Sequence, residues 1–258
     1  MKKIMYFLLI ILLIVSIAIS SYFIYKQLKE ENEQESIFNN LSEIIQDDTE
    51  NRLKDNLKSN NYIKIQELYK ENNDLIGWIN IEDTNIDYPV MQTKNNEEYY
   101  LRKNFYKKYS SYGTPFLASS CNIDTSENLI VYGHHMQNSK MFGELENYKK
   151  EDFYKSHKYI NFYTLEADIK YEIFAVFRTN MDIGLILSSY NNTFKYYQNI
   201  ELDNEEDYTR FINKCCELSY YDTGIKPNYK EKLITLSTCD YTTKNSRLVV
   251  IAREIIGE

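Results

Sequence analysis

Cys239 is the residue in this chain best suited to nucleophilic chemistry. It closes a run of β-forming residues, Leu233 to Cys239, and a polar stretch follows it. A thiol at the end of a strand is held rigidly and remains open to a substrate. From position alone, a cysteine that merely caps the core explains Cys239 equally well.

Two other residues could assist such a thiol. His134 follows Gly133 at the end of an apolar run, and glycine permits a close backbone approach or an unusual φ there. An imidazole can withdraw the thiol proton and later return it to a leaving amine. Arg247 opens the last β-like run, where its permanent charge could favour a thiolate and stabilise an oxyanion. Taken alone, Arg247 fits an ordinary surface ion pair better.

The elements that must position these residues are short β-like runs separated by polar turns. They are rich in Ile, Val, Tyr and Phe, which favour strands. The runs are Ile76–Ile81, Tyr88–Met91, Thr114–Ala118, Asn128–Gly133, Tyr159–Thr164, Asp168–Arg178, Leu233–Cys239 and Arg247–Arg253. Eight such strands predict a mainly β fold, either a barrel or a sandwich.

Helical spacing appears in three other segments. One apolar stripe runs from Ile37 to Ile45 and predicts a helix that packs on the domain behind it, and a second helix is predicted over Tyr62–Glu71. A third helix interrupts the late strands, with Asp203 and Glu206 as its expected cap. Its stripe places Cys215 in the core, and we expect Cys216 to pack there too.

The N-terminus predicts one transmembrane helix. Lys2 and Lys3 precede an apolar run from Ile4 to Ile24, which at about 1.5 Å per residue is long enough to cross a bilayer. A cleaved signal peptide is the alternative, but its apolar region is usually shorter. The lysines favour a cytoplasmic N-terminus and an extracellular remainder. We therefore divide the chain into an anchor (residues 1–25), a charged helical stalk (26–60) and a catalytic domain (61–258).

Composition excludes several classes of protein. The 258 residues carry a formal charge of −8, which argues against nucleic-acid binding. The four cysteines, Cys121, Cys215, Cys216 and Cys239, form no CxxC pair and no zinc-ligand spacing. We therefore expect free thiols, with no metal and no cofactor.

Several motifs together resemble the sortase family, and class B within it most closely. Thr235 to Cys239 matches the sortase TLxTC signature, Gly133-His134 matches the segment of the catalytic histidine, and the order His, Cys, Arg is that of the family. Further similar segments are Ile76–Ile81, Ile86–Gln92, Tyr99–Leu101, Tyr132–Met136, Met141-Phe142 and the helix around Asp203 to Leu218. The resemblance covers residues 60–255 and uses separate motifs in the right order.

The resemblance implies an eight-stranded sortase β-barrel with N-terminal helices and a helix inserted between the sixth and seventh strands. It also implies a cysteine transpeptidase. Cys239 would attack a C-terminal sorting motif of secreted proteins, and an amine of the peptidoglycan cross-bridge or of its lipid-linked precursor would resolve the thioester. His134 would act as acid and base and Arg247 would hold the oxyanion. Ser237 and Thr238 would position the peptide.

Two alternatives remain open. A thiol peptidase that only hydrolyses the motif would use the same three residues, and only the fate of the thioester separates the two enzymes. A membrane-tethered peptide-binding module would leave Cys239 without a catalytic role. Only seven residues separate Cys239 from Arg247, so the loop between them is short. Cys121 has no role implied by the family, and we expect it to be structural.

Overall fold

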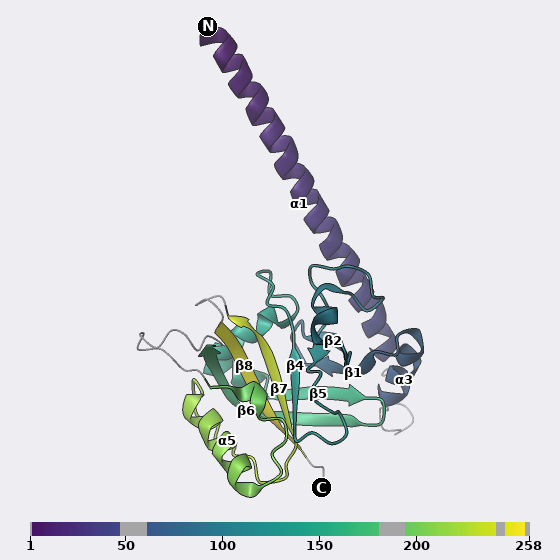
Figure 1. Cartoon of the computed structure of the whole chain (residues 1–258), viewed down its shortest axis with the longest axis vertical. Helices are drawn as coiled ribbons and strands as arrows, with labels where there is room; N and C mark the ends of the chain where they lie inside the picture. The colour runs from purple at the N-terminus through teal and green to yellow at the C-terminus, as the bar shows by residue number, and fades with distance from the viewer. Residues whose placement is uncertain (1, 47–60, 181–193, 241–245, 256–258) are drawn as a thin grey trace.

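The predicted β-barrel is confirmed. The computed structural model describes residues 2–46, 61–180, 194–240 and 246–255. Eight strands close into a barrel in the order β1-β2-β3-β4-β7-β8-β6-β5 (Figure 1). The strands are β1 (Leu75–Asn80), β2 (Asp87–Met91), β3 (Phe116–Leu117), β4 (Asn128–Tyr132), β5 (Tyr159–Thr164), β6 (Asp168–Asn180), β7 (Leu233–Asp240) and β8 (Ser246–Glu254).

The barrel contains two parallel pairs among antiparallel ones. β4 pairs with β7 in parallel, from Asn128 opposite Leu233 to Tyr132 opposite Ser237. β2 meets β3 in parallel through a single residue pair, because β3 is only two residues long. The strand predicted over Thr114–Ala118 is therefore longer than the observed β3. Because β4 and β7 are parallel, the residues that follow these two strands lie at the same end of the barrel.

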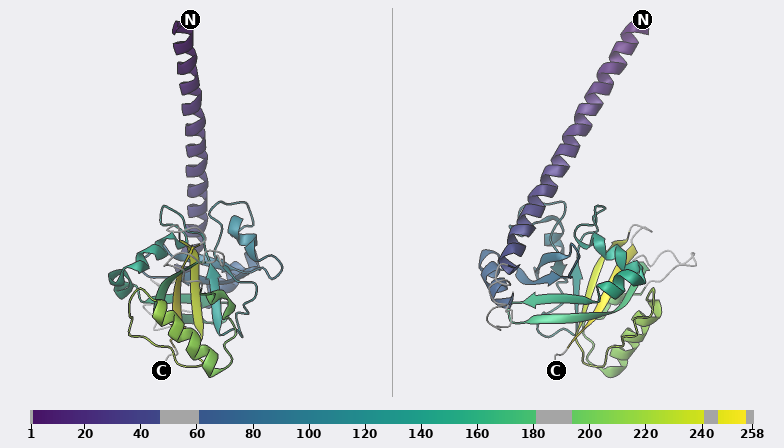
Figure 2. Two further views of the ribbon diagram at one scale, coloured as in Figure 1. Left: turned by 60° about the vertical axis from the view of Figure 1, so that its left-hand side comes forward. Right: turned by 180° about the vertical axis from the view of Figure 1, so that it is seen from behind.

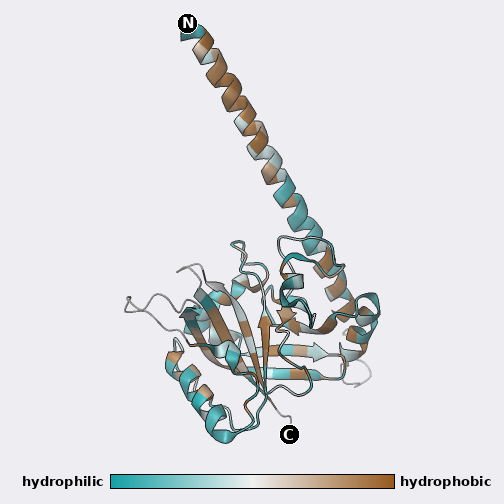
Figure 3. Cartoon of the chain, viewed as in Figure 1, coloured by the Kyte–Doolittle hydropathy of each residue, from teal (hydrophilic) through white to brown (hydrophobic). Residues whose placement is uncertain are grey.

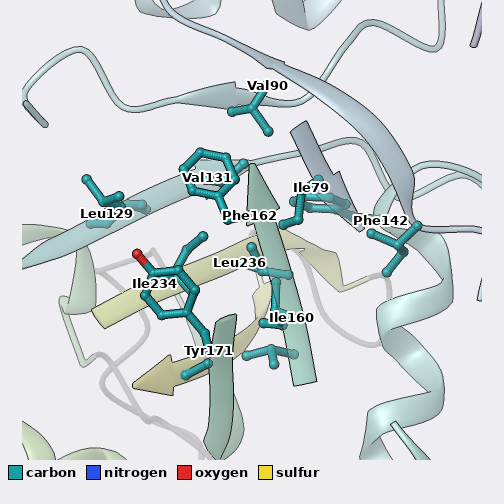
Figure 4. Close-up of a cluster of buried hydrophobic side chains, with 14 of the residues drawn as sticks. Ile79, Val90, Leu129, Val131, Phe142, Ile160, Phe162, Tyr171, Ile234 and Leu236 are labelled. Carbon is teal, nitrogen blue, oxygen red and sulfur yellow. The ribbon is translucent and has the colours of Figure 1, made fainter. Parts of the chain in front are cut away.

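Apolar side chains from most of the strands fill the barrel. Figure 4 shows this core, in which Ile79 of β1, Val90 of β2, Val131 of β4, Phe162 of β5 and Leu236 of β7 are all fully buried. The burial of β5 alternates along the strand, as expected for one face turned inward. Because this interior is packed with side chains, a substrate can bind only at the outer surface or at an end of the barrel.

Helices surround the barrel at its ends and sides. They are α3 (Asn61–Glu71), α4 (Glu151–Ser156) and α5 (Glu205–Leu218), with 3₁₀ segments η1 (Glu97–Arg102), η2 (Phe142–Lys149) and η3 (Tyr196–Gln198). As predicted, α5 lies between β6 and β7 in the chain. Its cap differs from the prediction, because the Asn204 side chain accepts a hydrogen bond from the Asp207 backbone N–H. Cys215 is buried as expected, whereas Cys216 is exposed and does not pack in the core.

One long helix, α1 (Lys2–Gln46), runs through both the predicted anchor and part of the predicted stalk. Its first part is apolar, exposed, and long enough to cross a membrane (Figure 3). Its last part packs on β2 and α3 through the buried side chains of Phe38, Leu41 and Ile45. The predicted packing of this segment on the domain is therefore confirmed. The boundaries at residues 25 and 60 stay a prediction, and residues 47–60 lie outside the described part of the chain.

Candidate active site

Three neighbouring strands bring the predicted site residues into register. Tyr132 of β4 pairs with Ser237 of β7. Two positions after Tyr132 comes His134, and two positions after Ser237 comes Cys239, both of which are predicted catalytic residues. Across the antiparallel β7–β8 pair, Cys239 lies directly opposite Arg247. The backbones of all three residues therefore meet at one end of the barrel, although they are far apart in the sequence.

Backbone contacts fix the position of His134. The Gly133 backbone N–H donates to the Ser237 carbonyl at 3.1 Å, which extends the pairing of β4 with β7 by one residue. The carbonyl of His134 accepts a hydrogen bond of 2.9 Å from the Phe142 backbone N–H. A Cβ on residue 133 would lie 2.6 Å from the Phe142 ring, so this position requires glycine for close approach, as predicted. His134 is thus held from both sides.

Nε2 of the His134 imidazole lies 2.7 Å from the carbonyl oxygen of Leu101 and forms a hydrogen bond with it. A carbonyl oxygen can only accept, so Nε2 carries a proton and Nδ1 is the basic nitrogen of the neutral ring. Burial lowers the pKa of His134 below its usual value, the Leu101 carbonyl opposes this shift, and the charge of Arg102 adds to it. The neutral, proton-accepting form is therefore favoured.

The structure describes the backbone of Cys239 within β7, but its side chain lies outside the described residues. The predicted role of the thiol therefore stays a prediction. Arg247 is the second residue of β8, with a half-buried side chain whose Nη1 donates to the Ser246 carbonyl at 3.3 Å. Arg247 also lies opposite Thr179 of β6. Its charge is close enough to Tyr132 to oppose the strong rise in the pKa of Tyr132 that burial causes.

Ser237 and Thr238 are buried, and their hydroxyls are engaged within the protein. The Ser237 hydroxyl and the Tyr196 hydroxyl are 2.6 Å apart, and the Thr238 hydroxyl donates to the Gly133 carbonyl at 2.8 Å. Their predicted contact with a peptide stays a prediction. In the same strand, the Thr235 hydroxyl donates to the side-chain oxygen of Asn128 at 2.8 Å. The polar residues of this motif therefore tie β7 to β4 and to η3.

The other cysteines are poor candidates for a nucleophile. Cys121 is buried, and burial raises the pKa of its thiol to about 11. Burial also raises the pKa of Cys215 well above its ordinary value, and that of the exposed Cys216 to a smaller degree. At neutral pH these three thiols are protonated, and a protonated thiol is a weak nucleophile.

One acidic cluster occurs among the described residues, at the opposite end of β4 from His134. Carboxylate oxygens of Glu127, Glu201 and Asp203 lie within 4.8 Å of one another. Two of them have protein partners, since Glu127 accepts from the Leu202 backbone N–H and Glu201 from the Ser126 hydroxyl. The sequence interpretation did not identify this cluster.

Several residues that support the site were not assigned roles from the sequence. The Leu101 carbonyl contacts the imidazole, the Phe142 ring packs under Gly133, and Tyr196 holds Ser237. Leu101 and Phe142 belong to segments that resemble the sortase family. The role of Leu101 is played by its backbone carbonyl, which every residue type has, so the sequence could not reveal it. Tyr196 is one of 25 tyrosines, so its residue type does not distinguish it.

Comparisons with known proteins agree with this geometry. The family model "Sortase domain" matches residues 79–255. Sortase B of Listeria monocytogenes is 33% identical over 178 residues, covering 69% of this chain and 67% of that protein. A Staphylococcus aureus sortase B–substrate complex has a TM-score of 0.72 at 26% identity and covers 88% of this chain and 98% of its own. A sortase B complexed with triglycine has a TM-score of 0.74 at 26% identity, covering 87% and 98%.

The family match spans more than half of the chain, and the Listeria relative supports the same assignment at the level of class. The His134, Cys239 and Arg247 backbones occupy adjacent strand ends in a closed eight-stranded barrel. The chain therefore belongs to the sortase family of transpeptidases, and within it to class B.

Proposed function

We propose that this sortase cleaves a C-terminal sorting motif in secreted proteins and joins the acyl part to a cell-wall amine. The observation that carries the proposal is the register of three adjacent strands, which aligns the backbones of His134, Cys239 and Arg247 at one end of the barrel. A thiolate, a base and a fixed cation are the groups that acyl transfer requires.

In the first half of the reaction, Nδ1 of neutral His134 accepts the thiol proton of Cys239. The thiolate attacks the scissile carbonyl, and the guanidinium of Arg247 stabilises the negative charge that develops on its oxygen. The carbon–nitrogen bond then breaks as His134 returns the proton to the leaving amine. The product is a thioester between Cys239 and the acyl part of the substrate.

In the second half, an incoming amine attacks the thioester and loses a proton to His134, and the Cys239 thiolate leaves. The partner amine is proposed to be that of a peptidoglycan cross-bridge or its lipid-linked precursor. Related structures support this direction, because one sortase B was solved with a substrate and another with triglycine. Ser237 and Thr238 are proposed to act indirectly, by holding the strand end beside which the peptide binds.

The proposed location is the outer face of the cell membrane. The apolar part of α1 serves as a single-pass anchor with a cytoplasmic N-terminus, and the barrel lies outside. The support for the anchor is the length and apolar composition of the helix and the exposure of its first part.

A soluble fragment beginning at residue 31 tests the reaction when it is incubated with a library of sorting-motif peptides, with and without triglycine. Mass spectrometry of the products is the readout, and a Cys239→Ala variant is the control. A peptide–triglycine product that requires Cys239 is the expected result. Cleavage with water as the sole acceptor would instead identify a hydrolase, and no reaction with any motif would favour the binding module.

A further inference from the structure

The segment of residues 103–111, which we name the docking loop, lies beside the part of α1 that follows the apolar run. A groove with a volume of about 970 Å³ separates the two. Tyr25, Leu28 and Lys29 line it from α1, and Asn104, Lys108 and Tyr109 line it from the docking loop. The loop therefore borders the same groove as Tyr25, which lies one residue beyond the end of the apolar run at Ile24.

The distance along α1 leaves little room between a bilayer and the domain. The Glu30 carboxylate accepts a hydrogen bond from the backbone N–H of Ser111 at the end of the docking loop. Glu30 is six residues beyond Ile24, which corresponds to about 9 Å of helix. The headgroup layer on each side of the hydrocarbon core is about 5–8 Å thick. If α1 crosses a membrane, this surface of the domain lies within or directly against the headgroups.

The exposed side chains of the docking loop are of the types that favour a membrane interface. Tyr109 is 69% exposed and Tyr106 is 46% exposed. Tyrosine combines an apolar ring with a polar tip, and lysines near an anionic leaflet are attracted to it. Lys107 pairs with Asp74 at 2.9 Å, whereas within the described part of the chain Lys108 forms no ion pair. Lys108 and the Tyr109 ring are therefore available to lipid, whereas the Tyr106 hydroxyl donates to Glu71 at 3.4 Å.

Acidic side chains at the same level of α1 have partners of their own. Glu30 binds the Ser111 backbone N–H, and Glu33 lies 3.7 Å from Lys29. These contacts reduce the repulsion that free carboxylates would exert on anionic lipid. The surface nearest the apolar run thus carries a basic and aromatic loop on a chain whose formal charge is −8.

The site end of the barrel faces the same direction. β8 runs down to the C-terminus, so the ends of β7 and β4 at Cys239 and His134 lie on the side from which α1 rises (Figure 2). In the loop after His134, Asn138 donates to Glu31 at 2.6 Å and Lys140 pairs with Glu35. Glu31 and Glu35 are seven and eleven residues beyond Ile24, or about 10–17 Å along the helix.

We infer that the docking loop rests on the lipid headgroups of the membrane that α1 enters, and that it holds the catalytic end of the barrel against an anionic bilayer. This inference rests on the proposed membrane anchor. It goes beyond that anchor, because a helix alone would tether the domain without fixing which face meets the lipid. The partner is a bilayer surface that contains anionic phospholipid.

Tryptophan quenching in lipid nanodiscs tests the inference with the full-length chain. The nanodiscs contain an anionic phospholipid and a second lipid with a nitroxide quencher on its headgroup. The chain has one tryptophan, Trp78, which is fully buried, so an added exposed tryptophan is distinguishable. The test variant is Tyr109→Trp. The matched control is Tyr229→Trp, four residues before β7 begins and hence at the opposite end of the barrel from Cys239.

We expect Tyr109→Trp to lose most of its added emission and Tyr229→Trp to keep its emission. Adding Lys107→Glu and Lys108→Glu to Tyr109→Trp should weaken the quenching, because like charges repel the loop from the anionic surface. Unchanged quenching after this charge reversal would overturn the attraction to anionic lipid. Unquenched Tyr109→Trp in a chain that co-elutes with the discs would overturn the docking and leave the anchor intact. A chain that does not enter the discs would overturn both.

Discussion

At the scale of single residues, the proposed reaction requires His134 to be neutral when it meets the thiol. Three features of its environment shift the pKa of His134. Burial lowers it, the Leu101 carbonyl raises it, and the nearby charge of Arg102 lowers it again. Because the folded-state pKa lies below 6.5, His134 contributes stability above the unfolded pKa that is lost as the pH falls through the folded pKa. The same shift extends activity toward acidic pH, since only the neutral imidazole can accept a proton.

The charge of Arg102 provides a test of this pKa. Arg102→Gln should move the acidic limb of kcat/KM to higher pH, by less than about one unit because the side chain is exposed and screened. The measurement is the pH profile of the peptide–triglycine reaction. Arg102→Lys keeps the charge and should keep the wild-type profile. A limb that moved to lower pH in Arg102→Gln would show that Arg102 does not act on His134 in this way.

Arg247 tests the oxyanion role in the same assay. Arg247→Lys keeps a positive charge but loses the planar fork of donors, so kcat/KM should fall about 10- to 100-fold. Arg253→Lys is the matched control, because Arg253 lies near the other end of β8 and pairs with Glu172 and Glu231. That control should keep its rate per folded molecule. A wild-type rate in Arg247→Lys would remove the proposed role of the guanidinium.

At the scale of elements, the site depends on contacts between segments that are far apart in the chain. α1 contacts the loop that follows His134, since Lys140 lies near both Glu31 and Glu35. Met141 of the same loop donates its backbone N–H to the Tyr88 hydroxyl of β2 at 3.1 Å. The next residue, Phe142, donates to the His134 carbonyl. Glu31 and Glu35 of α1 are therefore connected to His134 through their ion pairs with Lys140 and the backbone hydrogen bond between Phe142 and His134.

Charge reversal tests this connection. Lys140→Glu should lower kcat several-fold with little change in KM, while stability changes by less than about 1 kcal/mol because the pair is partly exposed. Combining it with Glu35→Lys should recover part of the loss. Lys155→Glu, which breaks a comparable pair with Glu151 on α4, is the control and should leave kcat unchanged. Equal effects on kcat in Lys140→Glu and Lys155→Glu would contradict the connection.

The sequence predicts the strands better than the contacts between them. β5 matches its predicted range, Tyr159–Thr164. β3 is shorter than predicted, and Thr114 at the start of the predicted run bonds instead to the Tyr100 carbonyl of η1. The cap of α5 at Asn204 was missed in favour of the adjacent Asp203, because both side chains can cap a helix. The sequence predicts that Arg247 lies near Cys239 only if their two strands are neighbours. The structure shows that β7 and β8 are paired, with Cys239 opposite Arg247.

At the scale of the whole molecule, α1 belongs both to the proposed anchor and to the catalytic domain. Phe38, Leu41 and Ile45 are at least 95% buried against the domain, so the end of α1 is part of the core and not a free stalk. The preceding turns of the same helix carry the apolar run. A single helix without a break therefore joins the proposed anchor to the barrel.

Truncation separates these two parts of α1. A fragment of residues 61–258 loses the three buried apolar side chains, so its free energy of unfolding should fall by about 4 kcal/mol or more relative to residues 31–258. Urea unfolding followed by circular dichroism measures the difference. The fragment 31–258 retains these contacts and serves as the control. Equal unfolding midpoints for the two fragments would show that α1 does not stabilise the domain.

The most direct test of the central claim is to trap the acyl-enzyme. The fragment 31–258 is incubated with a cleavable sorting-motif peptide without an amine, and the intact protein and its peptides are analysed by mass spectrometry. We predict an acyl adduct on Cys239 that hydroxylamine removes and that triglycine converts to a peptide–triglycine product. The adduct should be absent from His134→Ala. An adduct on another residue, or the same product from Cys239→Ala, would contradict the account.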